Sequence, residues 1–435
     1  MKYTLSLTSV RRFIISTVMA LSLVAPAAAI LNPVAPQASA ATTCKYPVHT
    51  SRQASTTPVA SVPIASYSTT DGDILAGAAY NISSKSYLAI GGNFDNIILS
   101  SGKKIPAQNF AILDGTSGAV VYAGKNINSF VYSISQRDNT VYAGGGFTNF
   151  NGVARKYIAA VNATTGSLTS WNPGAASKVV AIAAGTKTVY YAGGHIRAVD
   201  TAGKSVYTAT VAGGPVRALL LSPGQTGLYV AGLFESVAGY KRHGLMELTA
   251  ATGKPITTFT PTLRADSGVG EKGDWDGEEG LALAWDGSYS PQRLILGYGG
   301  AKNNGVASIN AANGSGYWNH AVEGDAQAVG IAGTTYIAGY HRSHGNNIGC
   351  PYPFFGTSFA ASNGAIQSYW NPKLSGFQSN EDGGNNGIQA MAINTSLKRV
   401  YLLGAFTKYG GTCDAAMVAC TGGTPRQSIA VYIYN

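Results

Sequence analysis

Residues 141–173, VYAGGGFTNFNGVARKYIAAVNATTGSLTSWNP, contain the pattern that decides the fold. A short apolar run at 141–145 ends in glycines and an aromatic residue, and a second apolar run at 158–162 passes through a turn to a tryptophan. Apolar runs of this length, separated by Gly, Asn and Thr, predict strands joined by tight turns.

The glycine and aromatic ending of this stretch recurs along the whole chain. The copies are Gly92-Asn93-Phe94, Gly145-Gly146-Phe147, Gly193-Gly194-His195, Gly232-Leu233-Phe234, Gly297-Tyr298-Gly299, Gly339-Tyr340-His341 and Gly404-Ala405-Phe406. The first and last copies lie 312 residues apart over six intervals, so the mean spacing is 52 residues, which suits a four-stranded unit. Repeated antiparallel sheets of four strands predict an all-β fold, a seven-bladed β-propeller.

The two ends of the chain predict how the repeats close. Residues 428–435 resemble a third strand, but no fourth strand follows them. Residues 62–67 could supply it, because they stand before the apolar run 74–79 in the same way that the predicted fourth strand 167–171 stands before the run 179–183. We therefore expect the N- and C-terminal strands to close the last blade together, because closure hides unpaired sheet edges. An open stack of repeats is the alternative.

The second copy also carries a family resemblance. The residues Phe147-Thr148, Asn151-Gly152, Arg155, Ile158 to Gly166 and Trp171-Asn172-Pro173 resemble the delta-sixty repeat β-propellers of secreted bacterial proteins. The resemblance covers roughly residues 60–435; it is strong in the second and last copies and weak in the third and fifth. It implies the fold and export, but no single activity and no catalytic residues. The turn from Ala160 to Trp171 is also similar to the tryptophan-docking repeat of quinoprotein dehydrogenases, but the tryptophan lies one residue too far from the glycine.

Composition excludes other classes of protein. Of the 435 residues, 45% are apolar and 11% are charged, and 55 are glycine, which argues against both disorder and a helical protein. The scattered basic residues and the expected compartment argue against nucleic-acid binding.

The N-terminus predicts export. Lys2, Arg11 and Arg12 precede an apolar stretch at 13–30, and small residues lead to Ala40. We expect residues 1–40 to be a signal peptide, 41–56 a linker and 57–435 the propeller. A retained membrane anchor is the weaker alternative, so the mature protein is expected to be secreted or cell-surface associated and not inserted in a membrane. Loss of three positive charges lowers the formal charge from +10 to +7, a sign that would suit anionic wall polymers, although dispersed solubilising charge is the favoured interpretation.

The four cysteines suit an oxidising compartment. Three pairings into two disulfides are open; we favour Cys413 with Cys420, which closes a short loop, and by elimination Cys44 with Cys350.

Four insertions are expected on one face of the propeller, at 262–280, 342–356, 373–387 and 411–424, and long loops on a rigid scaffold often bind ligands. The candidate ligand-binding residues in them are Asp274, Trp275, Asp276, Glu278, Glu279, Tyr352, Phe377, Glu381 and Asp382. No cofactor is assured, but Asp274, Asp276 and Glu278 offer the oxygen ligands that calcium takes, with a solvated acidic loop as the alternative. The rings could stack on sugars while the acids accept hydroxyl hydrogen bonds.

Export, the resemblance and these loops favour a monomeric extracellular binding module for a glycan or cell-wall polymer. Two alternatives stay open: a glycoside hydrolase using the carboxylates of residues 270–279 or those of Glu381 and Asp382, and a structural surface protein without a ligand.

Overall fold

The fold is all-β and propeller-like. The computed structural model describes residues 64–262, 278–300, 304–322, 324–340, 356–367, 374–375, 387–409, 412–413, 420–421 and 424–434, all within the unit Thr43–Asn435. These residues form small antiparallel sheets, which confirms the all-β prediction. No helix among the described residues is long and apolar enough to cross a membrane.

Successive stretches of the chain form the main sheets, in which each strand pairs with the next. The first is β2 (Asp73–Ile82), β3 (Lys85–Asn93), β6 (Phe110–Asp114) and β7 (Val120–Ala123), and the second is β8 (Val131–Arg137), β9 (Thr140–Gly145) and β12 (Ile158–Asn162). Next come β13 (Ala181–Ala184), β14 (Thr188–Ala192), β15 (Ile196–Asp200) and β16 (Ser205–Ala209), followed by β18 (Val216–Leu221), β19 (Gly227–Gly232) and β22 (Leu245–Thr249). The sheet after these is β23 (Glu278–Asp286), β24 (Arg293–Gly300), β25 (Gly305–Asn310) and β26 (Gly316–Ala321). The last two are β27 (Ala326–Ala332), β28 (Thr335–Tyr340) and β29 (Gly356–Ala360), then β31 (Gly387–Asn394), β32 (Arg399–Ala405) and β37 (Ile429–Ile433).

Short strands pair in the connections between these sheets. They are β1 (Thr69–Thr70) with β4 (Asn96–Ile98) and β5 (Lys104–Pro106), β10 (Asn149–Phe150) with β11 (Val153–Ala154), and β17 (Val211–Ala212) with β20 (Ser236–Val237) and β21 (Tyr240–Lys241). The others are β30 (Leu374–Ser375) with β33 (Lys408–Tyr409) and β36 (Thr424–Pro425), and β34 (Thr412–Cys413) with β35 (Cys420–Thr421).

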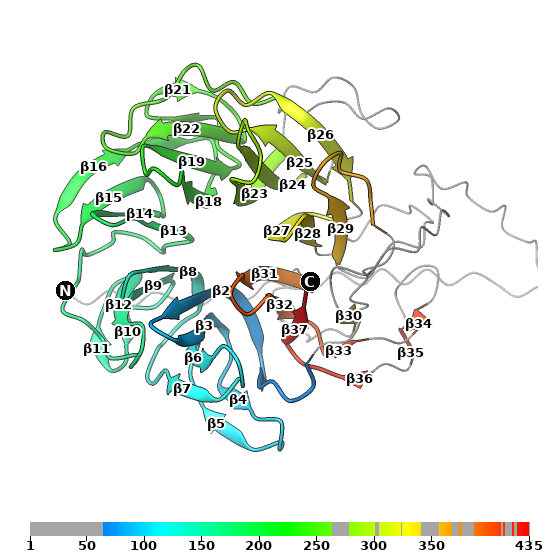
Figure 1. Ribbon diagram of the computed structural model, residues 1–435. Coiled ribbons are helices and arrows are strands. Elements are labelled where there is room, and N and C mark those ends of the chain that lie inside the picture. Colours follow the sequence, from blue (N-terminus) through cyan, green and yellow to red (C-terminus); the bar gives the residue numbers. More distant parts are fainter. Residues whose placement is uncertain are drawn as a thin grey trace, which may run out of the picture. The chain divides into compact units, whose positions relative to one another are not determined.

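The first strands of the main sheets contact one another in sequence order. Each of these strands contacts the next in the series β2, β8, β13, β18, β23, β27 and β31. The last of them, β31, also contacts β2, so the two ends of the series meet (Figure 1). The first strand of each main sheet is therefore its innermost strand.

Glycines in the second strands let neighbouring sheets approach closely. A Cβ on Gly91 would overlap Val131 of the next sheet, and one on Gly339 would overlap Ile388. Where the first and last sheets meet, the arrangement is reversed, because a large side chain on the second strand, Leu403, fills the space beside Gly77. Large and small residues thus alternate across these contacts, as close packing of the core requires.

Turns after the third strands are held by rings from the preceding sheet. Gly166, Gly253 and Gly364 have φ of +70°, +69° and +74°. A Cβ on each would overlap, in the same order, Tyr122, Tyr207 or Trp318, all from the fourth strand of the sheet before. Only glycine gives both the left-handed backbone and the room for the ring.

The N-terminal segment occupies the equivalent place beside the first sheet. Gly118 has φ of +76°, a Cβ on it would lie 2.9 Å from the Tyr67 ring, and the Tyr67 hydroxyl donates to the Asp114 carbonyl at 3.0 Å. The Ile64 N–H donates to the Val431 carbonyl of β37 at 2.7 Å. Within the described part of the predicted strand 62–67, residues 64–67 form a turn with this one ladder-like bond instead of a regular strand.

A buried arginine attaches this segment to the last sheet. Arg426 is 7% exposed and donates to the carbonyls of Ala65 and Tyr67 at 3.3 and 2.8 Å. In the second sheet the Arg155 guanidinium donates in the same way to the Thr169 carbonyl at 2.9 Å. The segment at 65–67 therefore corresponds to the segment around Thr169.

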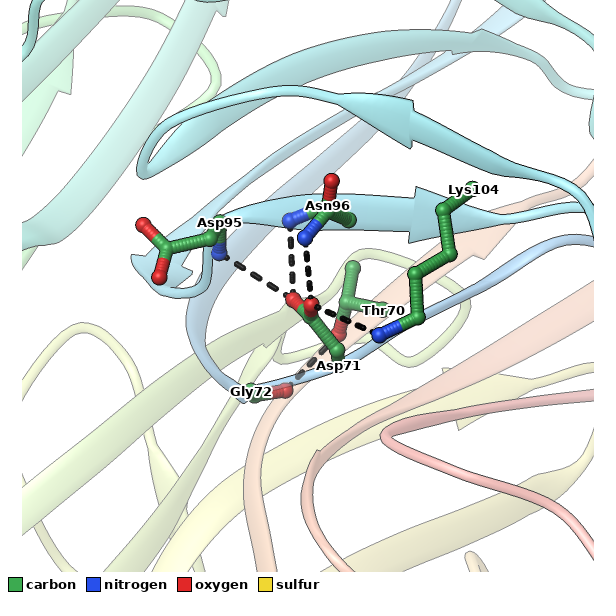
Figure 2. Close-up of polar contacts among 6 residues, drawn as sticks. All are labelled: Thr70, Asp71, Gly72, Asp95, Asn96 and Lys104. Carbon is green, nitrogen blue, oxygen red and sulfur yellow. Dashed lines mark hydrogen bonds and ion pairs between the residues drawn. The ribbon is translucent and has the colours of Figure 1, made fainter.

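An acidic cap fixes the connection that enters β2 (Figure 2). Asp71 accepts bonds from the backbone N–H of Asp95 and Asn96 at 3.1 and 2.8 Å and from the Asn96 amide at 2.6 Å, and Lys104 lies 3.7 Å away. Burial raises the pKa of Asp71, but these bonds outweigh burial and hold its pKa below the usual value. Asn128 holds the corresponding place in the next sheet, three residues before Val131 as Asp71 is three residues before Ile74. Its Oδ1 accepts hydrogen bonds from the backbone N–H groups of Thr148 and Asn149, each at 2.9 Å.

Two predicted repeat copies are out of register by one residue. Just before the bulge, Val131 pairs with Gly145 and Val216 pairs with Gly232. At the same position in two later sheets the second strand carries a tyrosine: Tyr298 pairs with Gly280, and Tyr340 pairs with Ala326. The predicted glycines of these copies, Gly297 and Gly339, therefore lie one residue before the position that Gly145 and Gly232 hold. The predicted fourth strand at 167–171 is also irregular, with a single bridge between Val161 and Leu168.

Candidate functional site

A β-bulge lies near the start of six of the innermost strands. The register shifts leave one extra residue in each, namely Leu75, Tyr132, Arg217, Leu281, Gln327 and Gln389. Val180 holds the matching place just before β13, where its N–H donates to the Ala192 carbonyl at 2.9 Å. A bulge turns a side chain out of the regular alternation, which is why bulges are frequent beside binding sites.

The bulges surround one end of a cavity of about 230 Å³. Its wall takes residues from β2, β8, β13, β18, β23, β27 and β31, all near the start of the strand. Tyr132, Arg217, Gln327 and Gln389 are the polar bulge residues in the wall. Behind them comes a level of small side chains, Ala76, Ser133, Ala181, Ala218, Ala282, Ala328 and Ala390, and the next level includes Ile134, Leu219 and Met391.

Main-chain groups also contribute to the wall. Each innermost strand pairs on one side only in the described sheets, so the N–H and C=O groups of its other edge have no strand partner, although the Ala184 N–H donates to the Ser135 hydroxyl at 3.0 Å. Such groups need hydrogen-bond partners from water or a ligand.

The polar side chains at the bulge end of the cavity, which we call its mouth, suit a hydroxyl-bearing molecule. Gln327 and Gln389 can donate and accept at once, and the buried Nε2 of Gln389 has no hydrogen-bond partner. Tyr132 makes an edge-to-face pair with Phe130, with ring centroids 6.0 Å apart, and places an aromatic surface beside the mouth. Arg217 is the one charged side chain among the described lining residues.

Two predicted acidic residues lie at the same end of the innermost strands. Glu278 and Glu279 begin β23, paired in register with Gly300 and Gly299, just before the bulge at Leu281. The predicted candidates Asp274, Trp275, Asp276, Tyr352, Phe377, Glu381 and Asp382 lie outside the described residues. The stretches 263–277 and 376–386 lead directly into β23 and β31, whose bulge residues Leu281 and Gln389 line the cavity.

In the described part of the chain, acidic side chains form no cluster that would support the calcium or the hydrolase hypothesis. Within it, no group of three metal-ligating side chains comes together. Two buried acids with raised pKa values do not line the cavity: burial raises the pKa of Asp73 to about 6 and that of Glu247, on β22, to about 7.

Sequence reasoning missed the bulge residues because it sought function in the insertions. The signal was present as single polar residues inside small apolar runs: Val216-Arg217-Ala218, Ala326-Gln327-Ala328 and Ile388-Gln389-Ala390. Aligning the copies by their innermost strands would have shown these residues to share one position.

The structure describes the cysteines of one of the two predicted pairs. Cys413 and Cys420 face each other in the register of β34 and β35, while Cys44 and Cys350 lie outside the described residues. The disulfide itself stays a prediction.

The chain matches no protein-family model and no curated protein sequence. Among solved structures, a chain of the "Crystal Structure of Mitotic Checkpoint Complex" is similar over 90% of this chain and 98% of its own length, with 13% identity and a TM-score of 0.53. The computationally designed Ika8 protein is similar over 84% of this chain and 98% of its own, with 13% identity and a TM-score of 0.48. At such identity a likeness concerns the fold alone, and the first of these agrees with the propeller-like arrangement of the sheets.

Proposed function

We propose that this protein is an extracellular binding module that binds carbohydrate at the mouth of the cavity. The observation that carries the proposal is the ring of bulges, which brings two amides, a guanidinium and a phenol from four different sheets to one opening. Sugar hydroxyls donate and accept hydrogen bonds together, as glutamine side chains and open strand edges do.

The proposed site keeps a role for the predicted insertions. Glu278 and Glu279 begin the strand that carries Leu281, and the segments at 263–277 and 376–386 enter strands at the same end. In this proposal the cavity mouth is the centre of the site and the acidic and aromatic residues of those segments are its rim.

The finer fold prediction is part of the same proposal. We propose seven blades, closed by the N-terminal segment in the last sheet, in a secreted member of the delta-sixty repeat family. The contacts of β31 with β2 and the place of Tyr67 on Gly118 support the closure. The glycine and aromatic repeat supports the family.

The test is a glycan array with the mature protein and three variants. Gln327→Ala and Gln389→Ala remove amides at the mouth, and Lys187→Ala alters an exposed turn at the opposite end of β13 and serves as the control. We expect the two glutamine variants to lose tenfold or more in affinity, since each lost hydrogen bond contributes about 1.4 kcal/mol, and the control to bind normally.

The same experiment separates the alternatives. Released sugar in a hydrolysis screen, lost on replacing Glu278 or Glu279 by Gln, would favour the hydrolase, and binding that needs calcium would support a metal on the rim. If the glycan array shows no binding and the hydrolysis screen releases no sugar, the structural surface protein is the alternative that remains.

A further inference from the structure

We infer that Asn151 is a site of spontaneous covalent modification, at which the side-chain amide converts to a mixture of aspartate and isoaspartate. The inference is independent of the proposed function. It follows from a comparison of the Asn–Gly pairs in the chain, because a glycine after asparagine has no Cβ to keep its backbone nitrogen away from the asparagine side chain. The structure describes four of the five pairs, all except the one at Asn386; the others begin at Asn151, Asn304, Asn313 and Asn363.

Asn151 and Gly152 form the tip of the hairpin of β10 and β11, where Phe150 pairs with Val153. Both tip residues have a left-handed backbone, with φ of +55° and +79°. Gly152 is exposed, and its N–H donates no hydrogen bond within the described residues. A Cβ on Gly152 would meet only the Asn126 amide nitrogen, at 3.8 Å. The backbone nitrogen that has to react is therefore open to water and free of a competing partner.

The pairs at Asn313 and Asn363 are held in place. In each, the glycine N–H donates to the carbonyl four residues earlier, at 2.8 and 2.7 Å. The asparagine side chains are occupied as well, because each Oδ1 accepts from the backbone N–H two residues on, at 2.9 and 3.1 Å. A Cβ on Gly314 or Gly364 would lie 2.5 or 2.4 Å from a neighbouring residue, so neither turn has room to rearrange.

Asn304 is protected in a different way. It is 8% exposed, and Gly305 begins β25, in register with Tyr298 on one side and Ala321 on the other. A Cβ on Gly305 would lie 2.2 Å from the Tyr298 hydroxyl, so the backbone here is enclosed. Among the described pairs, the reacting atoms are thus accessible at Asn151.

The reaction needs only water as a co-reactant. The Gly152 nitrogen attacks the side-chain carbonyl carbon of Asn151, and its proton passes through solvent to the departing amide, which leaves as ammonia. This step closes a cyclic succinimide. Water then adds to one of the two succinimide carbonyl carbons. Opening on one side gives aspartate, and opening on the other leaves the main chain running through the side-chain carbon, which is isoaspartate.

The modification reaches the packed core through the residue before it. Phe150 is fully buried, and its ring centroid lies 5.1 Å from that of Phe147 and 5.5 Å from that of Phe110 in the first sheet. Isoaspartate lengthens the main chain by one carbon at the tip, so Phe150 and Val153 can no longer keep their pairing. Aspartate keeps the length, tolerates a left-handed φ and can still accept from the Lys125 N–H, which lies 3.3 Å from the present side-chain oxygen. Isoaspartate should therefore lower stability, whereas aspartate should not.

The experiment is peptide mapping by mass spectrometry of the mature protein, aged at neutral pH in ordinary and in heavy-oxygen water. We expect Asn151 to convert about tenfold faster than Asn313 or Asn363, because those turns must first break hydrogen bonds, and a factor of ten corresponds to about 1.4 kcal/mol. Each converted residue should carry one heavy oxygen, and an isoaspartyl methyltransferase should label most of the product. In denaturant, which removes the turns, the pairs should convert at similar rates.

Two variants test the link to the core. Asn151→Gly keeps a turn that allows left-handed φ but has no amide to lose, so its melting temperature should not change on ageing. Asn151→Asp should melt like fresh wild-type protein, and aged wild-type protein should melt at a lower temperature than either.

Conversion of Asn313 or Asn363 as fast as that of Asn151 in the folded protein would overturn the inference. So would an acid at Asn151 that forms without isoaspartate. If aged protein that contains isoaspartate melts like fresh protein, the loss of stability is refuted and the site of modification stands.

Discussion

Glycines at the turns after the third strands connect local conformation to the packing between sheets. Gly166 combines a φ of +70° with the ring of Tyr122 directly over its Cα, so two separate constraints act on one residue. Gly174 has a similar φ of +67°, but a Cβ there would meet no atom within 4 Å. The pair separates the cost of the backbone conformation from the cost of the steric overlap.

Gly174→Ala should lower the free energy of unfolding by about 1 kcal/mol, the cost of a left-handed non-glycine residue. Gly166→Ala should lower it by about 3 kcal/mol or more, because the methyl group also displaces the Tyr122 ring. Urea denaturation of both variants measures the difference. Equal losses would show that the ring moves freely and does not hold the turn.

Glu247 should make stability depend on pH. Burial raises its pKa in the folded protein to about 7, above its value in the unfolded chain. The folded state therefore holds a proton that the unfolded chain has released, and stability should fall as pH rises from about 4.5 to 7. Asp73, with a pKa of about 6, acts in the same direction over a lower range.

Glu247→Gln should reduce this dependence, because an amide does not ionise. Between pH 5 and 7.5 the wild-type protein should lose about 1–3 kcal/mol more stability than the variant. Chemical denaturation at several pH values checks this. Parallel curves for the two proteins would mean that the carboxyl group is not buried as the structure has it.

Among the elements, the strands were predictable where the apolar run and the turn agree. The predicted strand at 158–162 is β12, residue for residue, because Ala163 to Gly166 fix its end. The copies around Tyr298 and Tyr340 were displaced because glycine also occurs at the adjacent position for a different reason, the close approach of the next sheet. The bulges were missed although Arg217, Gln327 and Gln389 each interrupt a small apolar run, because a single polar residue in one strand has no meaning until the copies are aligned.

The N-terminal segment should be required for the last sheet. A chain that begins at Thr69 lacks Tyr67 and leaves Arg426, 7% exposed, without its carbonyl acceptors at Ala65 and Tyr67. Its melting temperature should fall by about 5 °C, on the basis of about 3–5 kcal/mol for a lost buried aromatic residue in a chain of this length. A chain that begins at Thr57 keeps the segment and should melt like the mature protein. Equal melting of the two truncated chains would contradict the closure.

Cys413 and Cys420 should form a disulfide, since they are cross-strand partners in β34 and β35. Peptide mapping without reduction should recover the two in one crosslinked fragment. A crosslink from Cys350 to either of them would refute the pairing, and with it the assignment of Cys44 to Cys350.

For the whole molecule, the expected state is a secreted monomer that begins at Ala41. Intact-mass analysis of protein recovered from the culture medium gives the first residue, and light scattering gives the number of chains. A cell-bound product that keeps residues 1–40 would favour the membrane anchor. A dimer would contradict the monomer prediction.

The hydrogen bond between Ile64 and Val431 brings the start of the described chain to the last sheet, which makes the order of the segments along the polypeptide a matter of choice. In a chain trimmed to begin near Ile64, a short linker to the segment after β37 could join the two without disturbing a sheet. New ends could then be opened at Gly174, where the space around the backbone is empty. In such a circular permutant the last sheet would be built from one continuous stretch of polypeptide, and its assembly would no longer wait for the two extremities of the chain to find each other.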